Sequence, residues 1–163
     1  MRKVERSEIP KIGAVLDTNV IISALLTRGR TPDQVVRQAG LTYQFCTSHE
    51  LLEEIEGVLH EPKIQKRSGM TEAEMSAFLT NLRSVAVVVE ALPALQVIKD
   101  DPDDDLILAC AVKAQADYLV SGDTHLLQLQ THEGIQIVSP AQFLTILQQS
   151  QGKKEKNNPR HPL

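Results

Sequence analysis

The alternation of short apolar runs with helical patterns constrains the fold of this chain more than any other feature. Apolar runs typical of buried strands lie at Ile12–Leu16, Tyr43–Cys46, Val85–Val89, Tyr118–Val120 and Ile135–Val138. Helical patterns are expected between them and after the last, at Asn19–Leu26, Pro32–Ala39, His49–His60, after Thr71, at Leu106–Ala116, near Leu126 and from Pro140 through Leu147. Strands that alternate with helices pair in parallel through right-handed crossovers. We therefore predict a single α/β domain, in which helices flank a central parallel β-sheet in three α/β/α layers.

Two of the predicted helices open with a capping-box pattern. Thr47 is followed three residues later by Glu50, and Thr71 is followed in the same way by Glu74. In such a pattern the hydroxyl and the carboxylate each satisfy a backbone N–H at the helix start. The sequence therefore predicts N-caps at Thr47 and Thr71, and a structural role for Glu50.

The end of the chain differs in composition from the rest. The domain is expected to occupy residues 1–150, because 163 residues suit one domain with a sizeable core. Residues 151–163 lack apolar periodicity and contain four basic residues but only one acidic residue. We expect this segment to be a basic, disordered tail.

The sequence also bears on the compartment. No apolar stretch approaches the roughly 18 residues that cross a bilayer, and no run of signal-peptide type follows Met1–Arg6. The two cysteines, Cys46 and Cys110, lie in apolar segments, which is typical of buried thiols in a reducing environment. We expect a cytoplasmic protein with no membrane partner.

Acidic residues follow two of the predicted strands. Asp17 comes directly after the first, and Asp123 follows Tyr118–Val120 through Ser121 and Gly122. The carboxyl ends of parallel strands meet at one edge of the sheet, where α/β folds bind ligands. Asp104 stands in an acidic segment just before a predicted helix. Carboxylates gathered in this way either keep protons or hold a hard cation.

Each acid also has a simpler explanation. Asp17 could cap the first helix, and Asp103 or Asp104 the helix after the acidic segment. Glu54 and Glu56 border the same apolar stripe on opposite sides, so helical geometry alone does not choose between them. The choice between a cap and a metal ligand therefore stays open at the level of single residues.

Four segments together resemble the PIN domain family of metal-dependent ribonucleases, in order from about Ile12 to Leu147. They are Val15–Val20, Ser48–Ile55, Asp101–Ala111 and Ala116–Asp123 with Leu126–Leu127 after it. The resemblance aligns Glu54, rather than Glu50 or Glu53, with the family's second acid. The chain is most similar to the branch that includes toxins of toxin–antitoxin systems. One departure is Ser121, which stands where the family usually has threonine and keeps the hydroxyl.

The resemblance implies a site and an activity. Asp17, Glu54, Asp104 and Asp123 would hold Mg²⁺ or Mn²⁺, and metal-activated water would hydrolyse RNA phosphodiester bonds. It implies that four further residues orient these carboxylates through hydrogen bonds, namely Thr18, Asn19, Asp101 and Ser121. It also implies an RNA substrate, a possible antitoxin protein and a homodimer. Val35, Val36 and Ala39 could contact a second copy or pack into the chain's own core.

Other functions remain in view. A metal-dependent phosphatase of the haloacid-dehalogenase type needs an aspartate two positions after the first, where this chain has Asn19. A PIN-like module that binds a partner without turnover is the main alternative. The net charge of −4 argues weakly against nonspecific nucleic-acid binding. The five histidines have no zinc-site spacing; His125, close to Asp123, either touches substrate or is a solvated residue at a helix start.

Overall fold

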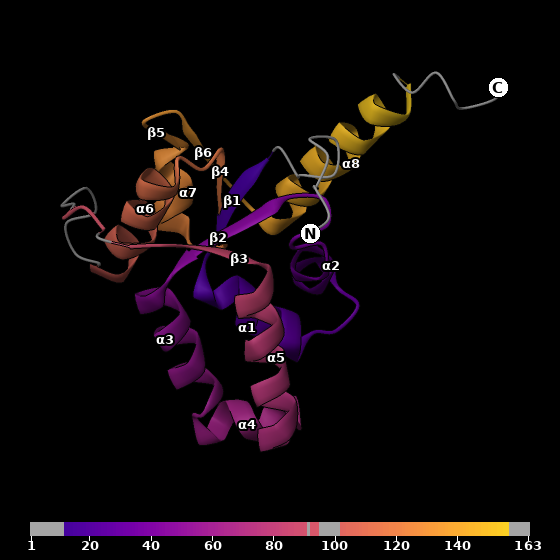
Figure 1. Cartoon of the computed structure of the whole chain (residues 1–163), viewed down its shortest axis with the longest axis vertical. Coiled ribbons are helices and arrows are strands. Elements are labelled where there is room, and N and C mark those ends of the chain that lie inside the picture. The colour runs from indigo at the N-terminus through magenta and orange to yellow at the C-terminus, as the bar shows by residue number, and fades with distance from the viewer. Residues whose placement is uncertain (1–11, 91, 95–101, 157–163) are drawn as a thin grey trace, which may run out of the picture.

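The computed structural model describes residues 12–90, 92–94 and 102–156 (Figure 1). Six strands form one sheet in the order β3-β2-β1-β4-β6-β5. The strands are β1 (Gly13–Leu16), β2 (Gln44–Ser48), β3 (Ala86–Val89), β4 (Tyr118–Val120), β5 (Thr131–His132) and β6 (Ile135–Val138). The helices are α1 (Thr18–Leu26), α2 (Thr31–Arg37), α3 (His49–Leu59), α4 (Pro62–Ser68), α5 (Glu72–Val85), α6 (Pro102–Ala114), α7 (Thr124–Leu129) and α8 (Pro140–Lys156).

The sheet is parallel except at one edge. β1 pairs in parallel with β2 and β4, and β3 and β6 extend the sheet in parallel on either side. β5 pairs antiparallel with β6. Glu133 and Gly134 join these two strands, both with positive φ, of 49° and 81°. Two such residues form the tight turn that a two-residue hairpin needs, so the short strand β5, which the sequence analysis did not predict, adds an antiparallel edge to the parallel sheet.

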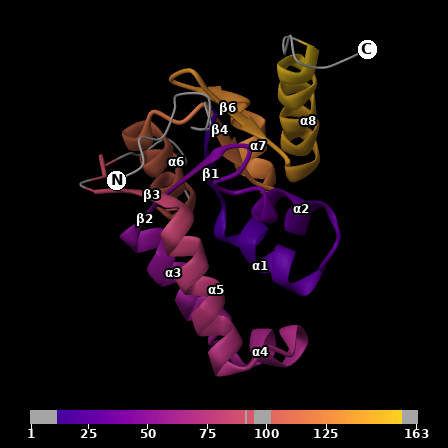
Figure 2. The same cartoon turned by 45° about the vertical axis from the view of Figure 1, so that its right-hand side comes forward.

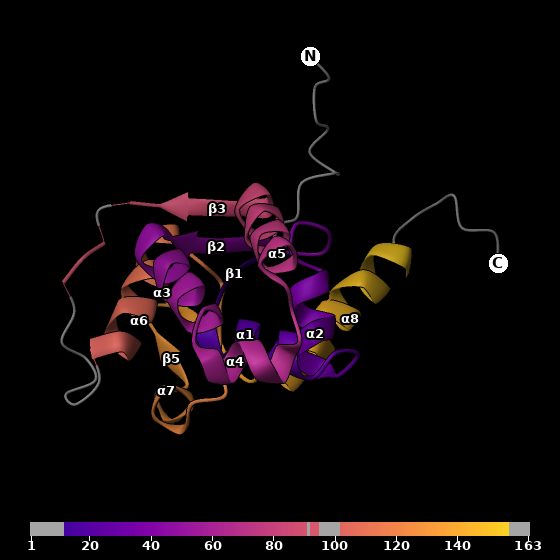
Figure 3. The same cartoon turned by 90° about the horizontal axis from the view of Figure 1, so that it is seen from below.

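Two apolar clusters cover the two faces of the sheet. Ala14 and Leu16 of β1 belong to the cluster packed against α1, α2, α3, α5 and α8. Val15 belongs to the other cluster, with side chains from α6 and α7. This alternation follows from the two-residue period of a strand. Seen from below, α6 and α7 lie on the opposite side from α2 and α8 (Figure 3). The predicted three-layer α/β/α fold is confirmed.

A helical arm leaves the sheet after β2. Helix α3 runs to α4, and α5 returns to the edge strand β3, so that α4 lies at the far end of the arm (Figures 1 and 2). Helix α4 packs against both α1 and α3, and its Ile64 is buried in the first cluster. The sequence analysis did not predict α4, because seven residues with one buried apolar side chain show no helical period.

The helix starts agree with the sequence in one case and differ in the other. Thr71 caps α5 with both hydrogen bonds of the capping box. At α3 the N-cap is Ser48, whose Oγ accepts the N–H of Leu51 at 3.2 Å. The prediction of Thr47 is wrong, because β2 continues through Thr47 to Ser48 in extended conformation. Glu50 is therefore the second residue of the helix, one position short of a capping-box partner.

Helix α8 is longer than predicted. It runs to Lys156 rather than ending at Leu147, and so occupies part of the segment expected to be disordered. Residues 157–163 lie outside the described residues. Phe143 and Leu147 bury the start of α8 in the first cluster, so the apolar pattern identified only the packed half of the helix. No helix in the described part of the chain is long and apolar enough to cross a membrane.

Candidate metal centre

The site is built at the carboxyl edge of the two central strands. Asp17 follows β1 and caps α1, with Oδ1 accepting the backbone N–H of Asn19 at 3.3 Å. Asp123 follows the neighbouring strand β4 and caps α7, with Oδ1 accepting the N–H groups of His125 and Leu126 at 2.7 and 3.4 Å. The caps are therefore observed at both positions, and because each uses one carboxylate oxygen, they leave ligation by the same residues open.

Ser121 joins these two aspartates. Its hydroxyl donates to Oδ2 of Asp17 at 2.7 Å and accepts the backbone N–H of Asp123 at 3.0 Å. Ser121 is fully buried, so both hydrogen bonds are shielded from water. A hydroxyl with both a donor and an acceptor function is required there. The Ser121 hydroxyl meets this requirement with its two hydrogen bonds.

Glu54 lies beside the start of α1. The hydroxyl of Thr18 donates to Oε2 of Glu54 at 3.1 Å, which joins α3 to the residue next to Asp17. Glu56 instead forms an ion pair with Arg83 of α5 at 3.2 Å, and Glu50 and Glu53 are exposed. The contacts therefore separate the two glutamates that the helical pattern left equivalent.

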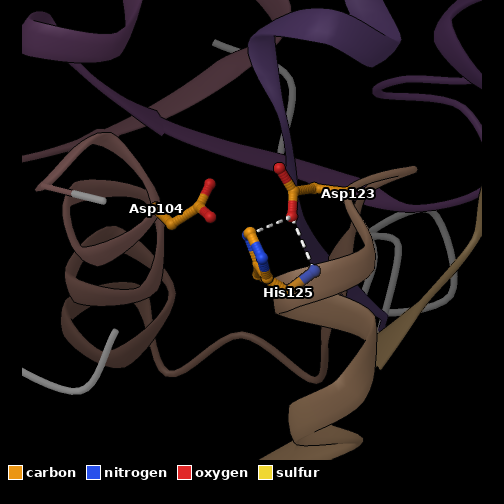
Figure 4. Close-up of side chains that lie close together, drawn as sticks. All are labelled: Asp104, Asp123 and His125. Atoms are coloured by element: carbon orange, nitrogen blue, oxygen red, sulfur yellow. Dashed lines mark hydrogen bonds and ion pairs between the residues drawn. The ribbon is translucent and has the colours of Figure 1, made fainter. Parts of the chain in front are cut away.

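Asp104 lies on α6, on the other face of the sheet from α1. Helix α6 begins at Pro102, so Asp104 lies within its first turn and is not an N-cap. The residue is only 5% exposed. One ligand atom each from Asp104, Asp123 and His125 lie within 4.8 Å of one another. Figure 4 shows the two carboxylates and the imidazole turned toward the same space.

The remaining predicted positions differ in what they contact. Thr18 is buried and bonds to Glu54, whereas Asn19 is exposed and contributes its backbone N–H to Asp17. Asp101 lies outside the described residues. The sequence analysis left two roles open for His125, substrate contact or a solvated position at a helix start, and the structure places its ring beside Asp104 and Asp123. Its position two residues after Asp123, on the first turn of a helix, was the sequence feature that pointed to the site.

The donor set fits a divalent cation. Carboxylate oxygens are the ligands that Mg²⁺ and Mn²⁺ prefer, and imidazole is a common additional ligand for transition metals. The open side of the cluster is His125, whose side chain is 71% exposed, while Asp104 forms its buried side. A cation held there would be reachable by a substrate from solvent.

The rest of the chain offers no comparable group among the described residues. Cys46 and Cys110 are free and buried, as the sequence predicted. Burial raises the pKa of both thiols, that of Cys110 to about 12. Thiols that stay protonated are poor nucleophiles and poor metal ligands. Among the described residues, the acidic cluster is therefore the group that could hold a metal ion.

Comparisons with known proteins show what the chain is similar to. A protein-family model described as the PIN domain matches residues 13–125, which include all four predicted acids. The uncharacterized protein MJ1680 of Methanocaldococcus jannaschii is 31% identical over 131 residues, 78% of this chain and 81% of that protein. The crystal structure of PAE2754 from Pyrobaculum aerophilum has a TM-score of 0.54 and 18% identity, covering 85% of this chain and 90% of that one. This last likeness concerns the fold alone.

Proposed function

The chain belongs to the PIN domain family, and from that premise we propose that it is an endoribonuclease that works with Mg²⁺ or Mn²⁺. PIN domains form a superfamily of metal-dependent nucleases, and the acidic cluster of this chain fits a metal. The observation that carries the proposal is the convergence of Asp104, from α6, and Asp123, from the loop between β4 and α7, on one solvent-facing point. Asp17 and Glu54, joined to this point through Ser121 and Thr18, complete the proposed ligand set.

The roles of the residues follow from their contacts. A divalent cation bound by the carboxylates would supply positive charge to the scissile phosphate and to the attacking water. Ser121 orients Asp17, and Thr18 orients Glu54, through hydrogen bonds to single carboxylate oxygens. Such outer contacts keep ligands in a productive geometry. No protein nucleophile is needed, and the buried thiols do not take part.

Exposed cations support an RNA substrate. Lys63, Lys66 and Arg67 are exposed on α4, at spacings that place neighbouring side chains on one helix face. Helix α4 packs against α1 and α3, the helices that carry Asp17 at the cap of one and Glu54 within the other. A polyanion long enough to run from the acidic site along α3 would therefore meet this basic element at the far end of the arm.

The test combines metal, RNA and one substitution. The full chain, freed of metal, is incubated with a panel of structured and single-stranded RNAs, with and without Mg²⁺ or Mn²⁺. We expect cleavage only with metal, and Asp104→Asn should reduce its rate by orders of magnitude because a negative ligand is lost. Without metal, the melting temperature of that variant should hold or rise, since carboxylate repulsion is relieved. Glu133→Gln, on an exposed turn, is the matched control for charge.

The alternatives give different outcomes in the same assay. Binding of RNA or protein with no cleavage at any metal would identify an interaction module. Hydrolysis of a phosphomonoester but not of RNA would identify a phosphatase. Unchanged RNA cleavage by Asp104→Asn would remove the proposed site.

A toxin role, with an antitoxin partner, is the finer part of the proposal. It rests on the family resemblance, and growth arrest on expression, relieved by a neighbouring gene, would test it. A homodimer is proposed on the same basis. Val35 and Ala39 are buried in the chain's own core and Val36 packs against it partly buried, which favours the core packing considered above over a dimer contact. Light scattering at micromolar concentration tests the dimer.

A further inference from the structure

His125 stands where a third ligand would complete the cluster of Asp104 and Asp123. We propose that its imidazole binds the metal directly and biases the site toward Mn²⁺ and later first-row metals over Mg²⁺. This inference rests on the proposed function, because it requires a divalent cation at the same site.

The position of the ring is the first argument. The backbone N–H of His125 donates to Asp123 Oδ1 at 2.7 Å, which holds the residue at the first turn of α7. Its ring Nδ1 lies 3.8 Å from the same oxygen, too far for a hydrogen bond. Asp104 reaches the same space from α6, within 4.8 Å (Figure 4). The backbone contact thus places the ring next to two carboxylates, at a distance that a shared cation would bridge.

Comparison with another histidine sharpens the argument. The Nδ1 of His60 lies 2.8 Å from the carbonyl oxygen of Glu56, so that ring is engaged in a local contact at the end of α3. His125 makes no ring hydrogen bond within the described residues. At 71% exposed, its ring is also not held by apolar packing. Ligation is therefore a role that its surroundings permit and that packing does not explain.

The chemistry of the donors sets the metal preference. Mg²⁺ takes oxygen ligands almost exclusively and keeps several waters. Imidazole nitrogen binds first-row transition metals better, with affinity rising from Mn²⁺ toward Co²⁺, Ni²⁺ and Cu²⁺. Two carboxylates alone would serve either class. The added nitrogen of His125 should therefore raise affinity for Mn²⁺ and Co²⁺ while changing that for Mg²⁺ little.

The test measures binding rather than cleavage. Mn²⁺ and Mg²⁺ are titrated calorimetrically into the metal-free full chain and into His125→Ala, without RNA. We expect Mn²⁺ affinity to fall by about tenfold or more in the variant, while Mg²⁺ affinity changes far less. Pulsed EPR of bound Mn²⁺ should show coupling to a directly bound nitrogen in the unchanged protein and lose it in the variant. His125→Gln, which replaces nitrogen by oxygen, should lose the same signal and keep the fold.

His49 supplies the matched control. It is 65% exposed, and its Nε2 lies 3.6 Å from the Glu90 carboxylate, away from the acidic cluster. His49→Ala should leave both affinities and the nitrogen coupling unchanged. Equal losses for the two metals in His125→Ala, or no nitrogen coupling in the unchanged protein, would overturn the assignment. If the unchanged protein binds metal and cleaves RNA while His125→Ala keeps its metal preference, only this inference fails. If it binds neither metal, the proposed function fails as well.

Discussion

The hydroxyl of Ser121 donates a 2.7 Å hydrogen bond to Oδ2 of Asp17, in a position closed to solvent. Because the same hydroxyl accepts the N–H of Asp123, it sets the relative position of two acids that follow neighbouring strands. The orientation of the site therefore depends on one side chain that need not touch the substrate.

Removing that hydroxyl tests its positioning role. Ser121→Ala should reduce metal affinity and RNA cleavage by about 10- to 100-fold, as other outer-contact losses do. Ser121→Thr keeps the hydroxyl and should remain near the unchanged protein. Calorimetric metal titration and single-turnover cleavage measure both effects. Equal activity in the alanine and threonine variants would show that the hydrogen bond is dispensable.

Glu54 and Glu56 form a natural pair for comparison, two residues apart on α3. Glu54→Gln should impair turnover, since the carboxylate bonded to Thr18 is a proposed ligand. Glu56→Gln should preserve turnover and change stability by less than about 1 kcal/mol, because the Arg83 pair is exposed. RNA cleavage rates of both variants measure turnover, and chemical denaturation measures their stability. A larger loss of turnover in the Glu56 variant would reverse the assignment.

The basic residues of α4 should act on affinity rather than on chemistry. Replacing Lys63, Lys66 and Arg67 by Gln should weaken RNA binding at low salt and make little difference at high salt. Each lost phosphate contact should reduce the salt slope by about 0.7 for a single strand. Fluorescence anisotropy against salt concentration gives this slope. Lys113→Gln is the control for Lys66→Gln, because each lysine lies in the last turn of its helix. Equal losses of RNA affinity in these two variants would show that α4 does not contact the RNA.

Asp33 gives a pH-dependent prediction away from the site. Burial alone would raise the pKa of this carboxyl, but hydrogen bonds from Gly29 and Arg37 and the Arg37 and Arg28 charges outweigh it, so the pKa is lowered. A lowered folded pKa gives stability that is present above the unfolded value of about 4 and lost as pH falls through the folded value. Asp33→Asn should cost about 1–2 kcal/mol at pH 7.

Urea unfolding of this variant at several pH values measures the window. The stability difference from the unchanged protein should stay constant from pH 7 to about 5 and shrink below about 4. Glu133→Gln should show no such window. A difference that grows toward acid would contradict the sign derived for Asp33.

Sequence patterns were sufficient to predict the three layers of the fold, because the layers follow from the local periodicity of apolar residues. The apolar runs predicted β1, β4 and β6, and each strand's alternation sends neighbouring residues to opposite clusters. The same reasoning placed Asp17 and Asp123 at one edge, since both follow parallel strands. These features need no knowledge of distant contacts.

The rest depended on contacts between residues far apart in the chain. Arg83, 27 residues beyond Glu56, distinguishes the two glutamates of α3, and no helical pattern contains that information. Helix α4 and the two-residue strand β5 are too short to show a period. The place of His125 in the cluster depends on Asp104, which comes from another helix. The start of α3 was shifted by one residue because Thr47 and Ser48 are both good caps.

The two helix caps at the site have a consequence for how the protein is made. The N–H groups of Asn19, His125 and Leu126 already donate to Asp17 and Asp123, so peptide dipoles offset part of the repulsion before any cation arrives. In zinc fingers, by contrast, binding the ion and folding are one event. Under the function proposed above, the two events would be separable: a newly synthesised chain would fold without metal and become active only when the ion is supplied.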